Sequence, residues 1–169
     1  MKNEEITYAL IGPSGYIAPR HIDAINNTNG RLNSVIDIKF TEESLSLLPD
    51  AINKYHSVDE YLGSRKLKEN YLVVCSPNFL HEEQILQGLN SGMDVICEKP
   101  VALSSKGVDK LQKAVNSSSN QTYSILQLRL HPVIQEIKLN IKAEENYKVK
   151  LIYVAKRDAD YFKTWKGNN

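Results

Sequence analysis

The feature that most constrains the fold of this chain is the regular alternation of short apolar runs with stretches of helical periodicity. The apolar runs have the length and β-branched composition of buried strands, and they cover residues 6–11, 33–40, 71–75, 93–97 and 122–128. Between them lie amphipathic stretches, the clearest at 16–27, 78–91 and 104–115. Each helix would return the chain to the starting end of a sheet, so the strands should be mostly parallel. The sequence therefore predicts an α/β fold with a doubly wound parallel sheet.

The remaining segments of this first part carry weaker signals. Residues 41–55 have a loosely helical pattern, and residues 57–70 are polar connecting material. Asn78 is a suitable residue to cap the helix that follows it, because its side chain can accept a backbone N–H. Pro132 stands where a further helix can begin.

Composition excludes several classes of protein. The 21 basic and 20 acidic side chains leave a formal charge of +1, whereas nucleic-acid binding needs a basic surface. No apolar run approaches the ~20 residues that span a bilayer. The first five residues, MKNEE, contain no signal-peptide apolar region, and the two cysteines have neither metal-ligand nor CxxC spacing. We therefore expect a cytoplasmic protein with no nucleic-acid, membrane or metal partner.

The end of the chain has a different period. Tyr147, Val149 and Leu151 alternate with lysines, which is typical of an antiparallel strand with one solvated face. We expect such a strand over 147–156, and a strand needs neighbours in a sheet. None follows before Asn169, so either another subunit pairs with it or the chain is the first part of something longer.

A glycine-containing turn follows the first strand. It consists of Gly12, Pro13, Ser14, Gly15, Tyr16 and Ile17. Glycines in this place permit a tight turn and let a pyrophosphate approach backbone N–H groups at the start of a helix. The spacing is GxxGxxA rather than GxGxxG, and a plain strand–helix turn is the alternative.

An acidic residue stands near the end of the second strand. Asp37 comes 22 residues after Gly15, close to the ~20 expected for an acid that binds the adenosine ribose. A carboxylate there favours NAD, because it would repel the 2′-phosphate of NADP. The alternative is a solvated strand end.

Two more strands end in polar residues at the edge where open α/β sheets bind ligands. Ser76 and Asn78 follow the strand at 71–75, and His81 lies one turn into the next helix. Glu98 and Lys99 follow the strand at 93–97. A lysine near a nicotinamide and a sugar hydroxyl can polarise that hydroxyl and assist proton removal. The alternatives are a structural turn for Ser76 and Asn78, a solvent-facing histidine and a surface EKP tripeptide.

Three segments together form the pattern of a known family, namely ALIGPSGYIAPRH (9–21), VVCSPNFLH (73–81) and DVICEKP (94–100). On these segments the chain resembles the glucose–fructose oxidoreductase/inositol dehydrogenase (Gfo/Idh/MocA) family over its whole length. The segments GPSGYIAPRH, ILQLRLHP (125–132) and TWKG (164–167) are similar, more narrowly, to the UDP-N-acetyl-2-amino-2-deoxyglucuronate dehydrogenases of bacterial surface-polysaccharide synthesis.

The resemblance implies a Rossmann NAD-binding domain over 1–122, followed over 123–169 by the incomplete start of an α+β substrate and oligomerisation domain. In family members the large second domain forms the subunit interface and supplies a histidine usually assigned to acid/base work. A homo-oligomer is therefore expected.

The resemblance also assigns roles by position. The turn from Gly12 to Ile17 would hold the pyrophosphate, and Asp37 would hold the adenosine ribose. Further cofactor contacts would come from Ser76, Asn78, His81, Glu98, Lys99, Gln127, Trp165 and Lys166. Lys99 would also act on the substrate. Arg129 and His131 are substrate candidates, with helix-start and surface positions as the alternative.

These assignments predict an NAD-dependent dehydrogenase that oxidises the C3 hydroxyl of a UDP-linked N-acetylglucosaminuronate in lipopolysaccharide O-antigen synthesis, or the N-terminal piece of one. Two alternatives remain. One is a non-catalytic NAD-binding module, and the other is a family dehydrogenase that acts on a free sugar or inositol.

Overall fold

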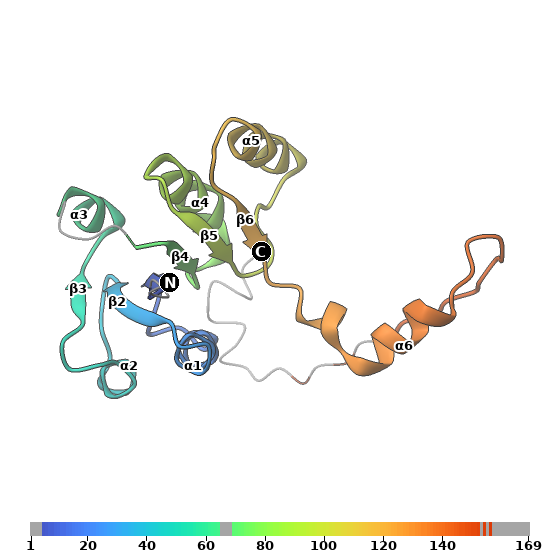
Figure 1. Cartoon of the computed structure of the whole chain (residues 1–169), viewed down its shortest axis with the longest axis horizontal. Coiled ribbons are helices and arrows are strands. Elements are labelled where there is room, and N and C mark those ends of the chain that lie inside the picture. Colours follow the sequence, from blue (N-terminus) through green and yellow to red (C-terminus); the bar gives the residue numbers. More distant parts are fainter. Residues whose placement is uncertain (1–4, 65–68, 153, 155, 157–169) are drawn as a thin grey trace. The chain divides into compact units, whose positions relative to one another are not determined.

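The computed structural model describes residues 5–64, 69–152, 154 and 156 (Figure 1). The chain divides into two compact units, Met1–Ile125 and Leu126–Asn169. Each unit is described by itself.

The first unit is built on a six-stranded parallel sheet with strand order β3-β2-β1-β4-β5-β6. The strands are Thr7–Ile11 (β1), Arg31–Ile36 (β2), Asn53–Tyr55 (β3), Tyr71–Val74 (β4), Asp94–Cys97 (β5) and Thr122–Ser124 (β6). The order reverses between β1 and β4, and open α/β sheets bind ligands at the carboxyl ends of the strands at such a reversal. The predicted doubly wound sheet is confirmed, and its reversal lies between the first and third predicted strands.

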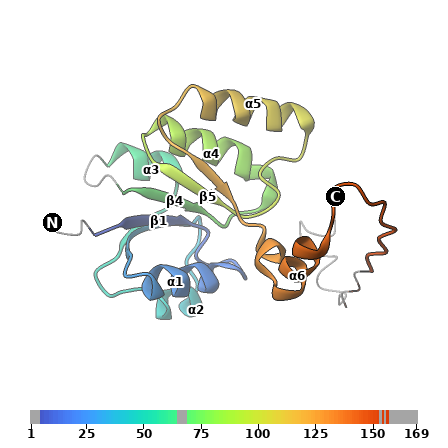
Figure 2. The ribbon, with the colours of Figure 1, turned by 45° about the vertical axis from the view of Figure 1, so that its right-hand side comes forward.

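Helices cover both faces of this sheet (Figure 2). They are Ala18–Asn27 (α1), Glu42–Ser46 (α2), Val58–Gly63 (α3), His81–Asn90 (α4) and Ser105–Asn116 (α5). In Figure 2, α1 and α2 lie below the sheet, and α3, α4 and α5 lie above it.

The core is correspondingly split into two layers. Val73 packs in the cluster that contains Ile22 of α1, whereas its neighbours Leu72 and Val74 pack in the cluster that contains Ile85 of α4. Alternate residues of one strand thus face opposite layers. Because both faces of the central strands are buried, their sequences are continuously apolar, which is why β1, β4 and β5 could be predicted.

Between β2 and β4 the sequence prediction was right only for a short helix. The segment 41–55 contains only the short α2 and then β3, and the segment 57–70 contains α3. Ser57 caps α3, since its hydroxyl accepts the N–H of Glu60 at 3.1 Å. β3 is held by pairing with β2, in which Ser34 lies opposite Asn53. A three-residue strand is too short to show a hydrophobic pattern, so its sequence does not reveal this pairing.

Several element ends also differ from the prediction, among them those of β2, which spans Arg31–Ile36 rather than 33–40. Asn78 does not cap α4 but begins a short 3-10 turn, Asn78–Leu80, so the helix begins at His81. β6 ends at Ser124 rather than at residue 128, and a second 3-10 turn, Gln127–Leu130, follows in the second unit.

In the second unit the expected helix after Pro132 is present as Pro132–Asn140 (α6). The strand expected over 147–156 is not formed by the described residues of that segment, 147–152, 154 and 156. Within the described residues no other strand pairs with this segment, and an amphipathic sequence forms a strand only when one does. No helix among the residues described is both long and apolar enough to cross a membrane.

Candidate functional site

The turn between β1 and α1 fits closely against the end of β4. Gly12 has φ of +82°, and a Cβ on it would lie 3.0 Å from the backbone carbonyl carbon and oxygen of Cys75. A Cβ on Gly15 would lie 3.1 Å from the carbonyl oxygen of Gly12. The position of Gly12 therefore requires glycine and Gly15 has little room for a side chain, and the bare backbone lets a ligand approach the N–H groups that precede α1. This cradle fits the pyrophosphate of a dinucleotide.

Asp37 lies directly beside this turn. Its Oδ2 accepts the backbone N–H of Ser14 at 3.1 Å, and its Oδ1 accepts the N–H of Lys39 at 3.2 Å. The Ser14 hydroxyl in turn donates to the carbonyl oxygen of Lys39 at 3.0 Å. The glycine turn and the segment after β2 are thus joined, with the carboxylate where the ribose next to a bound pyrophosphate would lie.

The turn after β4 is held by the protein itself. The Ser76 hydroxyl donates to Gln84 Oε1 at 2.5 Å. His81 is fully buried, and its two ring nitrogens each lie 2.8 Å from a carbonyl oxygen, Nε2 from Ser76 and Nδ1 from Pro100. The prediction that the His81 ring lines the cofactor path is therefore corrected. Because both of its polar atoms are engaged with backbone, the ring ties the turn after β4 to the turn after β5.

Replacing His81 by leucine should lower the free energy of unfolding by about 1–3 kcal/mol, since the buried turns at Ser76 and Pro100 lose the polar ring that lies between their carbonyl oxygens. Urea denaturation followed by circular dichroism measures this difference. His56→Leu is the control, because His56 is exposed. Equal stabilities of the two variants would contradict the assigned role of His81.

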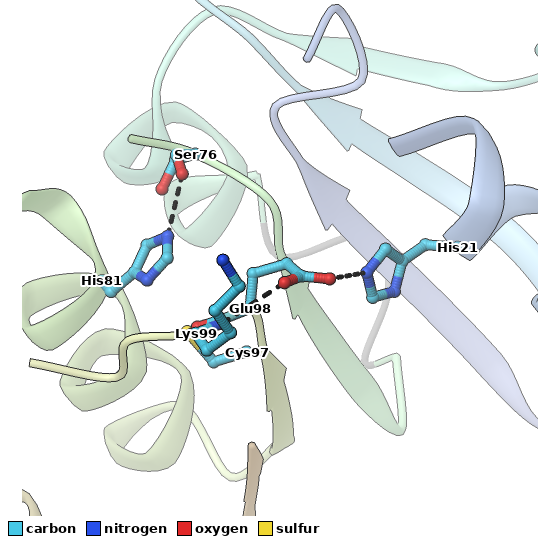
Figure 3. Close-up of polar contacts among 6 residues, drawn as sticks. All are labelled: His21, Ser76, His81, Cys97, Glu98 and Lys99. Atoms are coloured by element: carbon cyan, nitrogen blue, oxygen red, sulfur yellow. Dashed lines mark hydrogen bonds and ion pairs between the residues drawn. The ribbon is translucent and has the colours of Figure 1, made fainter. Parts of the chain in front are cut away.

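The turn after β5 carries the remaining polar groups (Figure 3). Glu98 Oε1 accepts the Nε2–H of His21 at 3.0 Å, and Glu98 Oε2 accepts the backbone N–H of Lys99 at 3.3 Å. Burial raises the pKa of Glu98, but the hydrogen bond and charge of His21, with smaller effects from Lys99, bring it below its ordinary value. Lys99 is exposed and is followed by a cis bond to Pro100. The site thus presents an ionised carboxylate and an amine on one turn.

The two cysteines nearby are not reactive groups. Cys75 and Cys97 are buried and free. Burial raises the pKa of both thiols, that of Cys97 to about 12, and the charge of Glu98 adds to the effect. They belong to different core clusters, on opposite faces of the sheet. Among the described residues no three His, Cys, Asp or Glu side chains are grouped to hold a metal ion.

The remaining predicted site residues lie in other segments of the chain. Gln127, Arg129 and His131 belong to the second unit, where they are exposed. Arg129 lies in the 3-10 turn, and His131 precedes α6. Trp165 and Lys166 lie outside the described residues. In the first unit, Pro13 is buried, Ile17 is partly buried and Tyr16 is 80% exposed at the edge of the glycine turn.

Sequence reasoning missed His21 as a site residue. It is in α1, next to the buried Ala18, Ile22 and Ile25. A histidine beside such an apolar stripe was the available signal. It did not identify the partner, Glu98, which is 77 residues away.

A parallel sheet of this order, with a glycine cradle at the reversal point and an acid after β2, defines a dinucleotide-binding Rossmann domain. The chain belongs to the Gfo/Idh/MocA family, described as "Oxidoreductase family, NAD-binding Rossmann fold", whose sequence profile matches residues 6–126.

Among solved structures, the chain is similar to the WlbA (WbpB) dehydrogenase from Thermus thermophilus. Its complex with NAD and alpha-ketoglutarate superposes with a TM-score of 0.88 at 31% identity, covering 96% of this chain and 55% of that one. Its complex with NAD and UDP-GlcNAcA superposes with a TM-score of 0.87 at 30% identity, and the match covers 95% of this chain and 55% of that one.

Two curated relatives from Bacillus subtilis have other substrates in their names. Glucose-6-phosphate 3-dehydrogenase is 34% identical over 96 residues, which are 56% of this chain and 26% of that protein. The scyllo-inositol 2-dehydrogenase (NADP(+)) IolU is 29% identical over 138 residues, 80% of this chain and 41% of that protein. The chain therefore spans about half of the solved relative and less than half of these curated ones.

Proposed function

We propose that this chain is the NAD-binding part of a dehydrogenase that oxidises the C3 hydroxyl of UDP-N-acetyl-2-amino-2-deoxyglucuronate, a reaction of O-antigen synthesis. The observation that carries the proposal is the likeness to a dehydrogenase crystallised with NAD and UDP-GlcNAcA, at 30% identity over 95% of this chain. The motifs GPSGYIAPRH and ILQLRLHP support the same subgroup.

Four parts of the site would contribute to this reaction. The turn at Gly12 would hold the pyrophosphate against backbone N–H groups, and Asp37 would accept hydroxyls of the adenosine ribose. Glu98 would accept hydroxyls of the nicotinamide ribose. NAD, when bound, supplies the hydride acceptor. Lys99 would donate a hydrogen bond to the substrate hydroxyl and so assist loss of its proton.

A second candidate substrate class is a free or phosphorylated sugar or an inositol. The specific observation in its favour is the pair of curated relatives that act on glucose 6-phosphate and scyllo-inositol. A non-catalytic NAD-binding module is the remaining alternative.

The test is in two stages. Calorimetry with NAD measures binding by the 169-residue chain, and NADH formation is then followed with UDP-GlcNAcA, glucose 6-phosphate and scyllo-inositol. We expect NAD binding by the chain, and turnover of UDP-GlcNAcA only when a second domain is present, because catalysis needs a substrate wall and exclusion of water. No NAD binding would refute the proposal, and turnover of the inositol alone would favour the second candidate.

NAD(H) should bind more tightly than NADP(H), since the Asp37 carboxylate would meet the 2′-phosphate. Asp37→Ala should narrow this difference by about 1–3 kcal/mol, the value of one hydrogen bond to a charged group. Titration of each protein with both cofactors by calorimetry measures the difference in binding free energy between NAD(H) and NADP(H). Asp23→Ala, on an exposed position of α1, is the matched control and should leave the gap unchanged. Equal affinities of the unmodified chain for both cofactors would remove this role from Asp37.

A further inference from the structure

The contact between His21 and Glu98 joins two elements that are not neighbours in the sheet. His21 is in α1, directly after the glycine turn, and Glu98 follows β5. The strand β4 lies between β1 and β5, so the contact crosses over its carboxyl end. The side chains of His21 and Glu98 are 12% and 11% exposed, and Nε2 and Oε1 are 3.0 Å apart (Figure 3).

This contact leaves Glu98 with a defined orientation. Both oxygens are engaged, Oε1 by His21 and Oε2 by the backbone N–H of Lys99. An ionised carboxylate has about four lone-pair positions, so two remain for further donors. A protonated carboxyl would instead carry a donor of its own and would accept fewer hydroxyl groups.

We propose that His21 is a positioning residue for the cofactor. Through its Nε2–H it holds the Glu98 carboxylate ionised and oriented toward the nicotinamide ribose, so that NAD affinity is kept constant into the acidic range. The inference rests on the proposed NAD binding at this site and adds to it a residue that touches neither the cofactor nor the substrate.

The electrostatic surroundings of Glu98 give the direction of the effect. Burial raises the pKa of Glu98, and His21 and Lys99 lower it. Among the described residues, the other titratable groups that interact with it are the thiols of Cys75 and Cys97, which burial keeps neutral by raising the pKa of each. Without His21, burial is opposed by Lys99 alone, so the pKa of Glu98 rises. The carboxyl then becomes protonated, and NAD affinity is lost, at a higher pH than in the unmodified chain.

The experiment uses two amide variants that differ in where they place an N–H. The amide nitrogen of His21→Gln takes the position of Nε2 and retains the donor, whereas that of His21→Asn takes the position of Nδ1 and leaves Glu98 without one. NAD affinity is measured by calorimetry between about pH 5 and pH 8, a range in which a buried carboxyl with a raised pKa titrates. Circular dichroism checks that each variant is folded.

We expect the NAD affinity of His21→Asn to fall by about tenfold or more between pH 8 and pH 5. Each pH unit below the pKa of Glu98 lowers the ionised fraction of its carboxyl about tenfold, and NAD affinity falls with that fraction. The unmodified chain, His21→Gln and the exposed-histidine control His56→Gln should show a much flatter profile. Glu98→Gln should bind weakly and without pH dependence in this range. A carbon NMR titration of the Glu98 carboxyl in the unliganded chain should show the higher pKa directly in His21→Asn.

Superimposable pH profiles of His21→Asn and the unmodified chain would overturn the inference. A loss of affinity that is equal at every pH would overturn it too, because that is the result of a merely structural role. Failure of the unmodified chain to bind NAD would instead refute the proposed function. If His21→Asn does not fold, His21→Leu also removes the donor and is judged by the same profiles.

Discussion

In the proposed dehydrogenase, assayed together with a substrate domain, replacing Lys99 by methionine should lower turnover by about 10²–10⁴-fold, the usual contribution of a general acid or base. Lys99 is the exposed residue of the turn after β5, where ligands of such a sheet bind. Among the described residues its ammonium makes no hydrogen bond or ion pair, so it is available to a substrate hydroxyl. Methionine keeps the length of the side chain and removes its proton chemistry.

Steady-state kinetics and NAD calorimetry together check this expectation. The loss should be in kcat, whereas NAD affinity should change much less, because Gly12 and Asp37 are unaltered. Lys106→Met is the matched control, since Lys106 is exposed on α5. If the turnover of Lys99→Met were within a few-fold of that of the unmodified enzyme, Lys99 would be a surface lysine with no catalytic role.

Replacing Gly12 by alanine should lower the free energy of unfolding by about 2–5 kcal/mol and NAD affinity by at least about tenfold. Two costs add. A left-handed backbone conformation costs about 1–2 kcal/mol for a residue with a Cβ, and forcing atoms into a packed region costs about 1–3 kcal/mol. Here φ is +82°, and the Cβ would meet backbone atoms of Cys75 and Ser76 at 3.0–3.1 Å.

A second glycine separates the two costs. Gly92 has φ of +79°, yet a Cβ there would meet nothing within 4 Å. Gly92→Ala should therefore cost only about 1–2 kcal/mol, for the backbone alone, and should leave NAD binding unchanged. Urea denaturation of both variants gives the two energies, and calorimetry gives the affinities. Equal losses of stability would show that the close approach of Gly12 to β4 has no energetic consequence.

The predictability of the fold follows the burial of its strands. β1 and β4 are buried on both faces, and β5 is apolar after Asp94, so each contains a run of apolar residues that ends at a turn residue. β3, in contrast, is an edge strand of three residues, none of them fully buried, and its sequence Asn-Lys-Tyr has no strand signal. It exists because β2 offers it backbone hydrogen bonds. The start of α4 was misjudged because Asn78 belongs to a 3-10 turn that precedes the helix.

The candidate site divides in the same way. Local sequence was sufficient to place Gly12, Asp37 and Lys99 at the carboxyl ends of strands, because a parallel sheet brings all such ends to one edge whatever the order of its strands. The contacts that orient those residues depend on that order. His21 and Glu98 are 77 residues apart, and Ser14 and Asp37 are 23 residues apart. Their meeting required β1, β2, β4 and β5 to be arranged side by side, which is decided by non-local packing of helices and strands. No periodicity within a segment records that packing, and only the tertiary structure shows it.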